Sequence, residues 1–171
     1  GKYEDAIKIY LQFLKISNSD EERFLSWYRL AAAYSETGKY DSAIEAALEA
    51  LALRPWYPDA FFLLGEISFM SGRYRHAREF LETGFTKKPS PTESIVWNPL
   101  DYTYNPRLVL AQVFAALYMP KESIKNFKEC LKIKPKSTFL KETIKKLKKE
   151  IAKFDFVDSL YQEAKKSEDS E

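Results

Sequence analysis

Two stretches of the chain carry the same pattern of residues. Residues 27–55 read WYRLAAAYSETGKYDSAIEAALEALALRP, and residues 61–89 read FFLLGEISFMSGRYRHAREFLETGFTKKP. They align at an offset of 34 residues, which pairs Gly38 with Gly72 and Tyr40 with Tyr74. A fixed period of this size is typical of repeat proteins, in which each unit buries its apolar side against its neighbours.

Within each unit the apolar spacing is helical. Trp27, Leu30, Ala31 and Tyr34 recur at the spacing that places side chains on one face of a helix. Gly38 follows at a position suited to a left-handed turn, because glycine has no Cβ to clash there. A second helical pattern then continues to a proline, which cannot extend a helix. Each unit is therefore predicted to be two helices joined by a glycine turn.

These residues resemble the tetratricopeptide repeat, whose pattern is W-x2-L-G-x2-Y, then A-x3-F, then P. The resemblance covers roughly residues 1–135 and implies an all-α, right-handed α-solenoid of helix-turn-helix repeats with a C-terminal capping helix. The matching residues of the three copies are Trp27, Leu30, Ala31, Tyr34, Ala43, Ala47 and Pro55, then Phe61, Leu64, Gly65, Ser68, Ala77, Leu81 and Pro89, then Arg107, Leu110, Ala111, Phe114, Ser123, Phe127 and Pro135. In the third copy Tyr118-Met119-Pro120 stands where the Gly-Arg-Tyr turn is expected.

The repeat divides the chain into seven segments. We expect the second helix of a truncated repeat at 1–16, repeats at 23–56 and 57–90, an aromatic insertion loop at 91–103, a divergent repeat at 104–136, a capping helix at 137–165 and a polar tail at 166–171. The chain starts halfway through a unit, which suggests a fragment of a larger protein. The apolar residues of the first helix predict self-association through residues 3–16.

Composition argues against catalytic chemistry. The single cysteine, Cys130, and the single histidine, His76, supply too few ligands for a His/Cys metal site, and we expect Cys130 to be a buried, inert thiol. The sequence has no glycine-rich phosphate loop. We therefore expect no catalytic, cofactor or metal site in this segment.

Charge and hydropathy exclude some classes of binding partner and a membrane-spanning segment. The net charge is +2, and the 12 lysines and 4 acids of residues 121–153 are spaced like a solvated helix face, so we expect no nucleic-acid binding. No apolar run is long enough to span a membrane. We expect a cytoplasmic protein.

The resemblance also implies where a ligand would bind, because the first helix of each repeat lines a concave groove. Carried onto this sequence, the groove residues are Tyr28, Ala32, Glu36, Asp59, Phe62, Glu66, Phe69 and Gln112. This set is aromatic, apolar and acidic. It favours a protein or peptide segment that is apolar or basic and amphipathic.

The insertion at 91–103 has two interpretations. The segment is rich in Pro, Asn, Ser and Thr, and its candidate binding residues are Trp97, Asn98, Asp101, Tyr102 and Tyr104. Either the aromatic residues pack onto the stack and cover the end of the groove, or they form a binding loop.

A second resemblance concerns the parent protein. Residues 97–106, WNPLDYTYNP, look like a junction in the repeat tails of bacterial family 2 glycosyltransferases. The resemblance implies an alternative function, in which this segment is an accessory C-terminal region that positions a catalytic domain or an acceptor.

Overall fold

The computed structural model describes residues 1–88 and 99–168, with side chains as far as residue 160. The described residues form helices and contain no strand. The helices are α1 (Lys2–Ile16), α2 (Asp20–Glu36), α3 (Tyr40–Leu53), α4 (Pro58–Met70), α5 (Tyr74–Thr86), α6 (Leu100–Ala116), α7 (Pro120–Ile133) and α8 (Thr138–Glu168). The all-α fold is therefore confirmed.

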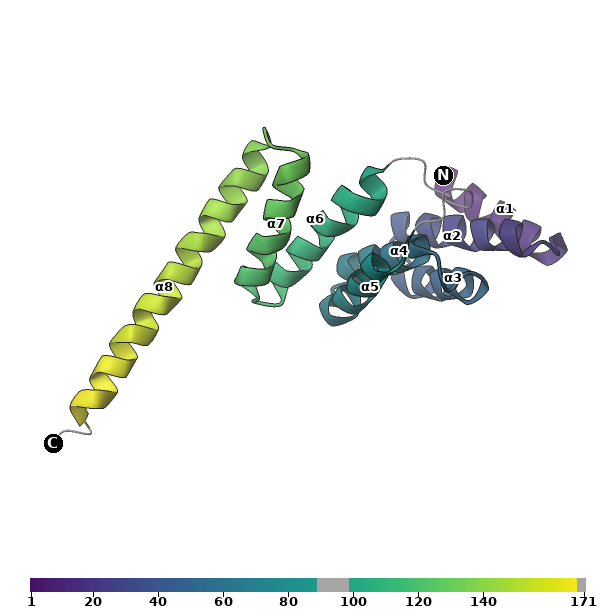
Figure 1. Ribbon diagram of the computed structural model, residues 1–171. Coiled ribbons are helices and arrows are strands. Elements are labelled where there is room, and N and C mark those ends of the chain that lie inside the picture. The colour runs from purple at the N-terminus through teal and green to yellow at the C-terminus, as the bar shows by residue number, and fades with distance from the viewer. Residues whose placement is uncertain (89–98, 169–171) are drawn as a thin grey trace.

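Successive helices pair into hairpins that stack on one another. The closest pairs are α2 with α3, α4 with α5, and α6 with α7, and each hairpin also contacts the next (Figure 1). Helix α1 packs against α2, and α8 packs against α7. This row of paired helices is a helical solenoid, in which α2, α4 and α6 are the first helices of the three hairpins.

The three hairpin turns share one backbone geometry. Gly38, Gly72 and Tyr118 have φ angles of +72°, +77° and +56°. In each turn this residue donates its N–H to the carbonyl three residues earlier, and the next residue donates to the carbonyl five residues earlier. These are the two hydrogen bonds of a Schellman motif, which needs a left-handed residue at this position. Tyr118 therefore takes, as a non-glycine residue, the conformation that glycine takes in the other two turns.

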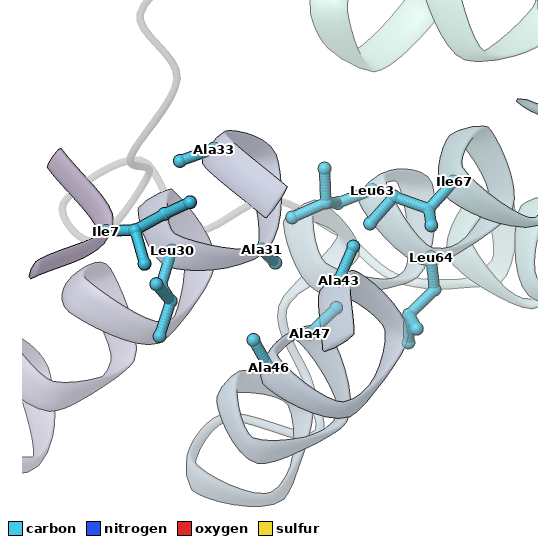
Figure 2. Packing of buried hydrophobic residues seen from close by; sticks show 10 residues of the cluster. All are labelled: Ile7, Leu30, Ala31, Ala33, Ala43, Ala46, Ala47, Leu63, Leu64 and Ile67. Atoms are coloured by element: carbon cyan, nitrogen blue, oxygen red, sulfur yellow. The ribbon is translucent and has the colours of Figure 1, made fainter. Parts of the chain in front are cut away.

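The core between the first two hairpins combines small and large side chains. Figure 2 shows Ala31, Ala43 and Ala47 between the larger Leu30 and Leu64, and all five are fully buried. The alanines allow the helices to approach closely, and the leucines fill the space that remains. Ile7 of α1 joins the same cluster, so the first helix is part of the stack.

Side chains cap the N-termini of α2 and α8. The hydroxyl of Ser19 accepts a hydrogen bond from the Glu22 N–H at the start of α2, and Ser137 accepts one from Leu140 at the start of α8. These bonds satisfy backbone donors that the first helical turn leaves free.

The third hairpin begins earlier than the sequence predicts. Residues 100–103, which we expected in the insertion loop, form the first turn of α6, and the helix continues through Pro106. Proline lacks the N–H that would bond to the fourth residue before it, so locally it disfavours a helix here. The tertiary structure compensates, because Leu100 and Tyr104 pack in the core shared by α6, α7 and α8.

Candidate functional site

A cavity lies where the first helices of the three hairpins face one another. Its volume is about 310 Å³, and residues of α2, α4 and α6 form most of its wall. The lining residues are Tyr28, Asp59, Phe62, Leu63, Glu66, Leu81, Asp101, Tyr102, Asn105, Pro106 and Val109. The cavity therefore lies on the face that the repeat pattern indicates for a ligand.

A hydrogen bond between two helices fixes one edge of the cavity. The hydroxyl of Tyr102 donates to Oδ1 of Asp59 over 2.7 Å, which joins the start of α6 to the start of α4. Asp59 is only 3% exposed. One turn further along α6, the side-chain amide of Asn105 donates to Asp101. The first bond joins two helices across 43 residues of sequence, and the second holds Asp101 in place within the first turns of α6.

The cavity wall is acidic. Asp59, Glu66 and Asp101 contribute carboxylates, and no described lining residue is lysine or arginine. Burial raises the pKa of Asp59, and the hydrogen bond from Tyr102 partly opposes that rise. Desolvation at the cavity wall raises the pKa of Glu66, and the negative charges of Glu36 and Asp101 raise it further. No lysine or arginine among the described lining residues lowers these pKa values.

The same carboxyl groups affect the pKa of Tyr28. Burial raises the pKa of its phenol, and the carboxylates of Asp59 and Glu66 raise it further, so the hydroxyl stays protonated at neutral pH. A protonated phenol is a hydrogen-bond donor and acceptor. A cationic group that entered the cavity would therefore meet three carboxyl groups and the Tyr28 hydroxyl.

Phe62 belongs both to the cavity wall and to the packing of its own hairpin. Its ring centroid lies 5.1 Å from that of Phe85 and 6.5 Å from that of Tyr102. A Cβ placed on Gly84 would come within 2.6 Å of the Phe62 ring, so the glycine is what admits the aromatic side chain. Substitution of Phe62 would therefore alter the hairpin as well as the groove.

The structure divides the predicted groove residues into two groups. Tyr28, Asp59, Phe62 and Glu66 line the cavity. The other four do not: Ala32 packs beside the first core cluster, Glu36 is exposed at the end of α2, Phe69 packs against the α5–α6 cluster, and Gln112 is half-buried on α6. The binding role of all eight stays a prediction.

The predicted insertion-loop residues are also divided. Asp101 and Tyr102 line the cavity from the first turn of α6. Tyr104 is buried in the α6–α7–α8 cluster instead, where Lys134 Nζ lies 3.8 Å from its ring centroid. Trp97 and Asn98 lie outside the described residues.

Val109 also lines the cavity, although it was not among the predicted groove residues. A signal was present, because Val109 corresponds to Leu63 at the 46-residue offset between the second and third repeats, and Leu63 also lines the cavity. Both are core-like aliphatic residues, which sequence reasoning assigns to packing.

The described part of the chain shows neither a metal-binding cluster nor a membrane-spanning helix. Residues 1–88 and 99–168 contain no group of three His, Cys, Asp or Glu side chains arranged to hold a metal ion. Among the same residues, no helix is long and apolar enough to cross a membrane. Cys130 is fully buried, as expected, and burial raises the pKa of its thiol to about 11.

Comparison with known protein families identifies the repeat. The family model for the tetratricopeptide repeat matches residues 24–57, which cover most of α2 and all of α3. The small glutamine-rich tetratricopeptide repeat-containing protein 2 of Mycosarcoma maydis is 34% identical over 88 residues, which are 52% of this chain and 24% of that protein. A TPR repeat-containing protein of Methanocaldococcus jannaschii is 33% identical over 87 residues, 51% of this chain and 15% of that protein. The chain thus spans a quarter or less of these two relatives.

Solved structures share the fold. A crystal structure of MamA superposes with a TM-score of 0.66 at 22% identity, covering 97% of this chain and 91% of that one. The TPR domain of Arabidopsis OM64 superposes with a TM-score of 0.62 at 14% identity, covering 77% of this chain and 99% of that one. None of these four proteins is named as a glycosyltransferase, so the alternative drawn from residues 97–106 gains no support from them. The helical pairs, the shared turn geometry and the family match agree that the chain contains tetratricopeptide repeats.

Proposed function

We propose that the groove binds a protein segment that carries both apolar and basic side chains. The observation that supports this proposal is the cavity of about 310 Å³ between α2, α4 and α6, whose wall contains three carboxylates and no described lysine or arginine. A basic side chain of the partner would enter this cavity and neutralise the wall. Opposite charges across an interface favour the matching partner over others.

The apolar part of the segment would contact the side chains between the carboxylates. Val109 and Leu63 contribute aliphatic side chains to the cavity wall, and Phe62 and Tyr102 contribute aromatic rings. Apolar contact contributes about 25 cal/mol for each Å² removed from water. The combination explains why the proposed ligand is amphipathic rather than purely basic.

The test uses two labelled peptides and fluorescence anisotropy. The first is a short amphipathic peptide of leucine and lysine, and the second has glutamate at each lysine position. We expect the lysine peptide to bind and the glutamate peptide not to bind. Equal affinity for the two peptides would contradict the proposal, because the charge of the cavity would then play no part.

A matched pair of variants locates the binding surface. Glu66→Gln combined with Asp101→Asn removes two charges from the cavity, whereas Glu45→Gln combined with Glu49→Gln removes two from the exposed face of α3. We expect the first pair to weaken binding of the lysine peptide about tenfold, which corresponds to about 0.7 kcal/mol for each lost ion pair. The second pair should leave it unchanged. Equal losses in both pairs would mean that the peptide responds only to overall charge.

A further inference from the structure

Helix α8 is much longer than the helix that supports it. At 1.5 Å per residue, its 31 residues span about 46 Å, whereas the 14 residues of α7 span about 21 Å. Among the helices of the described part of the chain, α8 lies beside α7, and its first turns share a core with α6 and α7. Figure 1 shows α8 extending well beyond the α6–α7 hairpin. About half of α8 therefore extends past the helices that pack against it in residues 1–88 and 99–168.

The unsupported part of α8 exposes several large apolar side chains. Phe154, Phe156, Val157 and Leu160 are 74%, 63%, 62% and 49% exposed. Earlier in the same helix, Leu140 and Ile144 are buried against α7. Clusters of large apolar side chains on the surface of a protein mark places where another surface packs.

A cavity opens beside this apolar segment. Its volume is about 620 Å³, and it lies between α8 and the turn that joins α6 to α7. Leu147, Ile151 and Phe154 contribute from α8, and Tyr118 and Met119 from the turn. The side chain of Tyr118 is 92% exposed. The cavity has room for apolar side chains from outside the chain.

The net charge along α8 changes from positive to negative at about residue 154. Residues 141–153 contain six lysines and two glutamates, whereas residues 154–160 contain two aspartates and no basic residue. Two copies of α8 placed side by side in opposite directions would set the acidic segment of each beside the lysine-rich segment of the other. Placed in the same direction, like charges would face one another.

We infer that α8 pairs antiparallel with α8 of a second copy of this chain. Residues 154–160 of each copy lie along residues 141–153 of the other, and their apolar side chains fill the cavity beside Tyr118. Such an arrangement has two-fold symmetry, because the same surface of both copies forms the interface. This surface is separate from the groove cavity, so the inference does not depend on the proposed function.

The experiment measures molar mass by light scattering and sedimentation velocity. We expect the 171-residue chain to be a dimer whose dissociation constant rises with salt. Val157→Glu should weaken the dimer about tenfold or more, because it buries an unpaired charge in the interface. A monomer at every accessible concentration, or a dimer indifferent to this substitution, would overturn the inference.

Charge exchange tests the direction of pairing. The variant Asp155→Lys with Asp158→Lys makes both segments of α8 basic, and Lys149→Glu with Lys153→Glu makes the lysine-rich segment far less basic. We expect each variant alone to dimerise more weakly than the parent chain, and an equimolar mixture of the two to form a heterodimer. Failure of the mixture to restore association would exclude antiparallel pairing through α8.

Two controls keep the result specific. The substituted residues are exposed, so circular dichroism should show unchanged helix content and thermal stability. Ile9→Glu places the same charge on an exposed position of α1, the helix for which the sequence predicts self-association. Dissociation of the dimer by Ile9→Glu, with no effect of Val157→Glu, would assign the interface to α1 and overturn the inference.

Discussion

The turn at Tyr118 offers a quantitative test of the fold. Tyr118 has a φ of +56° at the position where the other two hairpins have glycine, and the hydrogen bonds around all three turns correspond. We predict that Tyr118→Gly stabilises the protein. The substitution leaves the turn as it is and removes the Cβ that the left-handed conformation disfavours.

The magnitude follows from two opposing contributions. A left-handed conformation costs a non-glycine residue about 1–2 kcal/mol. Glycine loses about 0.5–1 kcal/mol more than alanine through its greater freedom in the unfolded chain. Because the Tyr118 side chain is 92% exposed, its removal forfeits little burial. The expected gain is about 0.5–1 kcal/mol, or roughly 1–4 °C in Tm for a chain of this length.

Two further substitutions separate the backbone from the side chain. Gly72→Ala introduces a Cβ that would meet no atom within 4 Å, so its net cost is the left-handed strain less the unfolded-state freedom that alanine lacks, about 0.5–1 kcal/mol. Tyr118→Ala removes the aromatic ring and keeps the strain, so it should leave stability nearly unchanged. Urea denaturation followed by circular dichroism, at an unchanged m value, measures all three. Destabilisation by Tyr118→Gly, or a neutral Gly72→Ala, would refute the reasoning.

Three other predictions concern buried contacts. Gly84→Ala should destabilise the protein by about 1–3 kcal/mol, because its Cβ would come within 2.6 Å of the Phe62 ring. In a double-mutant cycle measured by urea denaturation, the Gly84→Ala/Phe62→Leu variant should lose less stability than the sum of the two single variants, and a simple sum would contradict the clash. Tyr102→Phe removes the hydroxyl that donates to Asp59, and the loss of one hydrogen bond to a buried carboxylate should cost about 1–3 kcal/mol in urea denaturation. The same substitution should raise the pKa of Asp59 further, whereas an unchanged carboxyl titration by NMR would show that the bond is absent in solution. The Cys130 thiol, with a pKa of about 11 and no exposed surface, should react with iodoacetamide only after unfolding, and rapid reaction of the native protein near pH 8 would contradict its burial.

Local patterns were sufficient to predict the hairpins. The spacing of Trp27, Leu30 and Tyr34 predicts one helical face, and Gly38 predicts the left-handed turn that follows it. Both features depend on residues within a few positions of one another, where backbone sterics and helical periodicity apply directly. The 34-residue period then extends the same prediction to the second hairpin.

The candidate site was only partly predictable. The repeat pattern indicated the helices that line the groove, and four of the eight residues chosen from it line the cavity. The pattern could not distinguish Phe69 from Phe62. Phe69 packs against the next hairpin, whereas Phe62 packs there and also lines the cavity. That distinction depends on how far neighbouring hairpins approach, which a single unit does not specify.

The sequence by itself determined the repeating unit, because helix periodicity, glycine turns and terminal prolines act over short distances. The tertiary structure decided where the third hairpin begins and what faces the cavity. Pro106 locally disfavours a helix, yet α6 starts six residues earlier because Tyr102 bonds to Asp59 and Tyr104 is buried in the core. Those partners lie up to 43 residues away along the chain, and only the stacking of the hairpins brings them together.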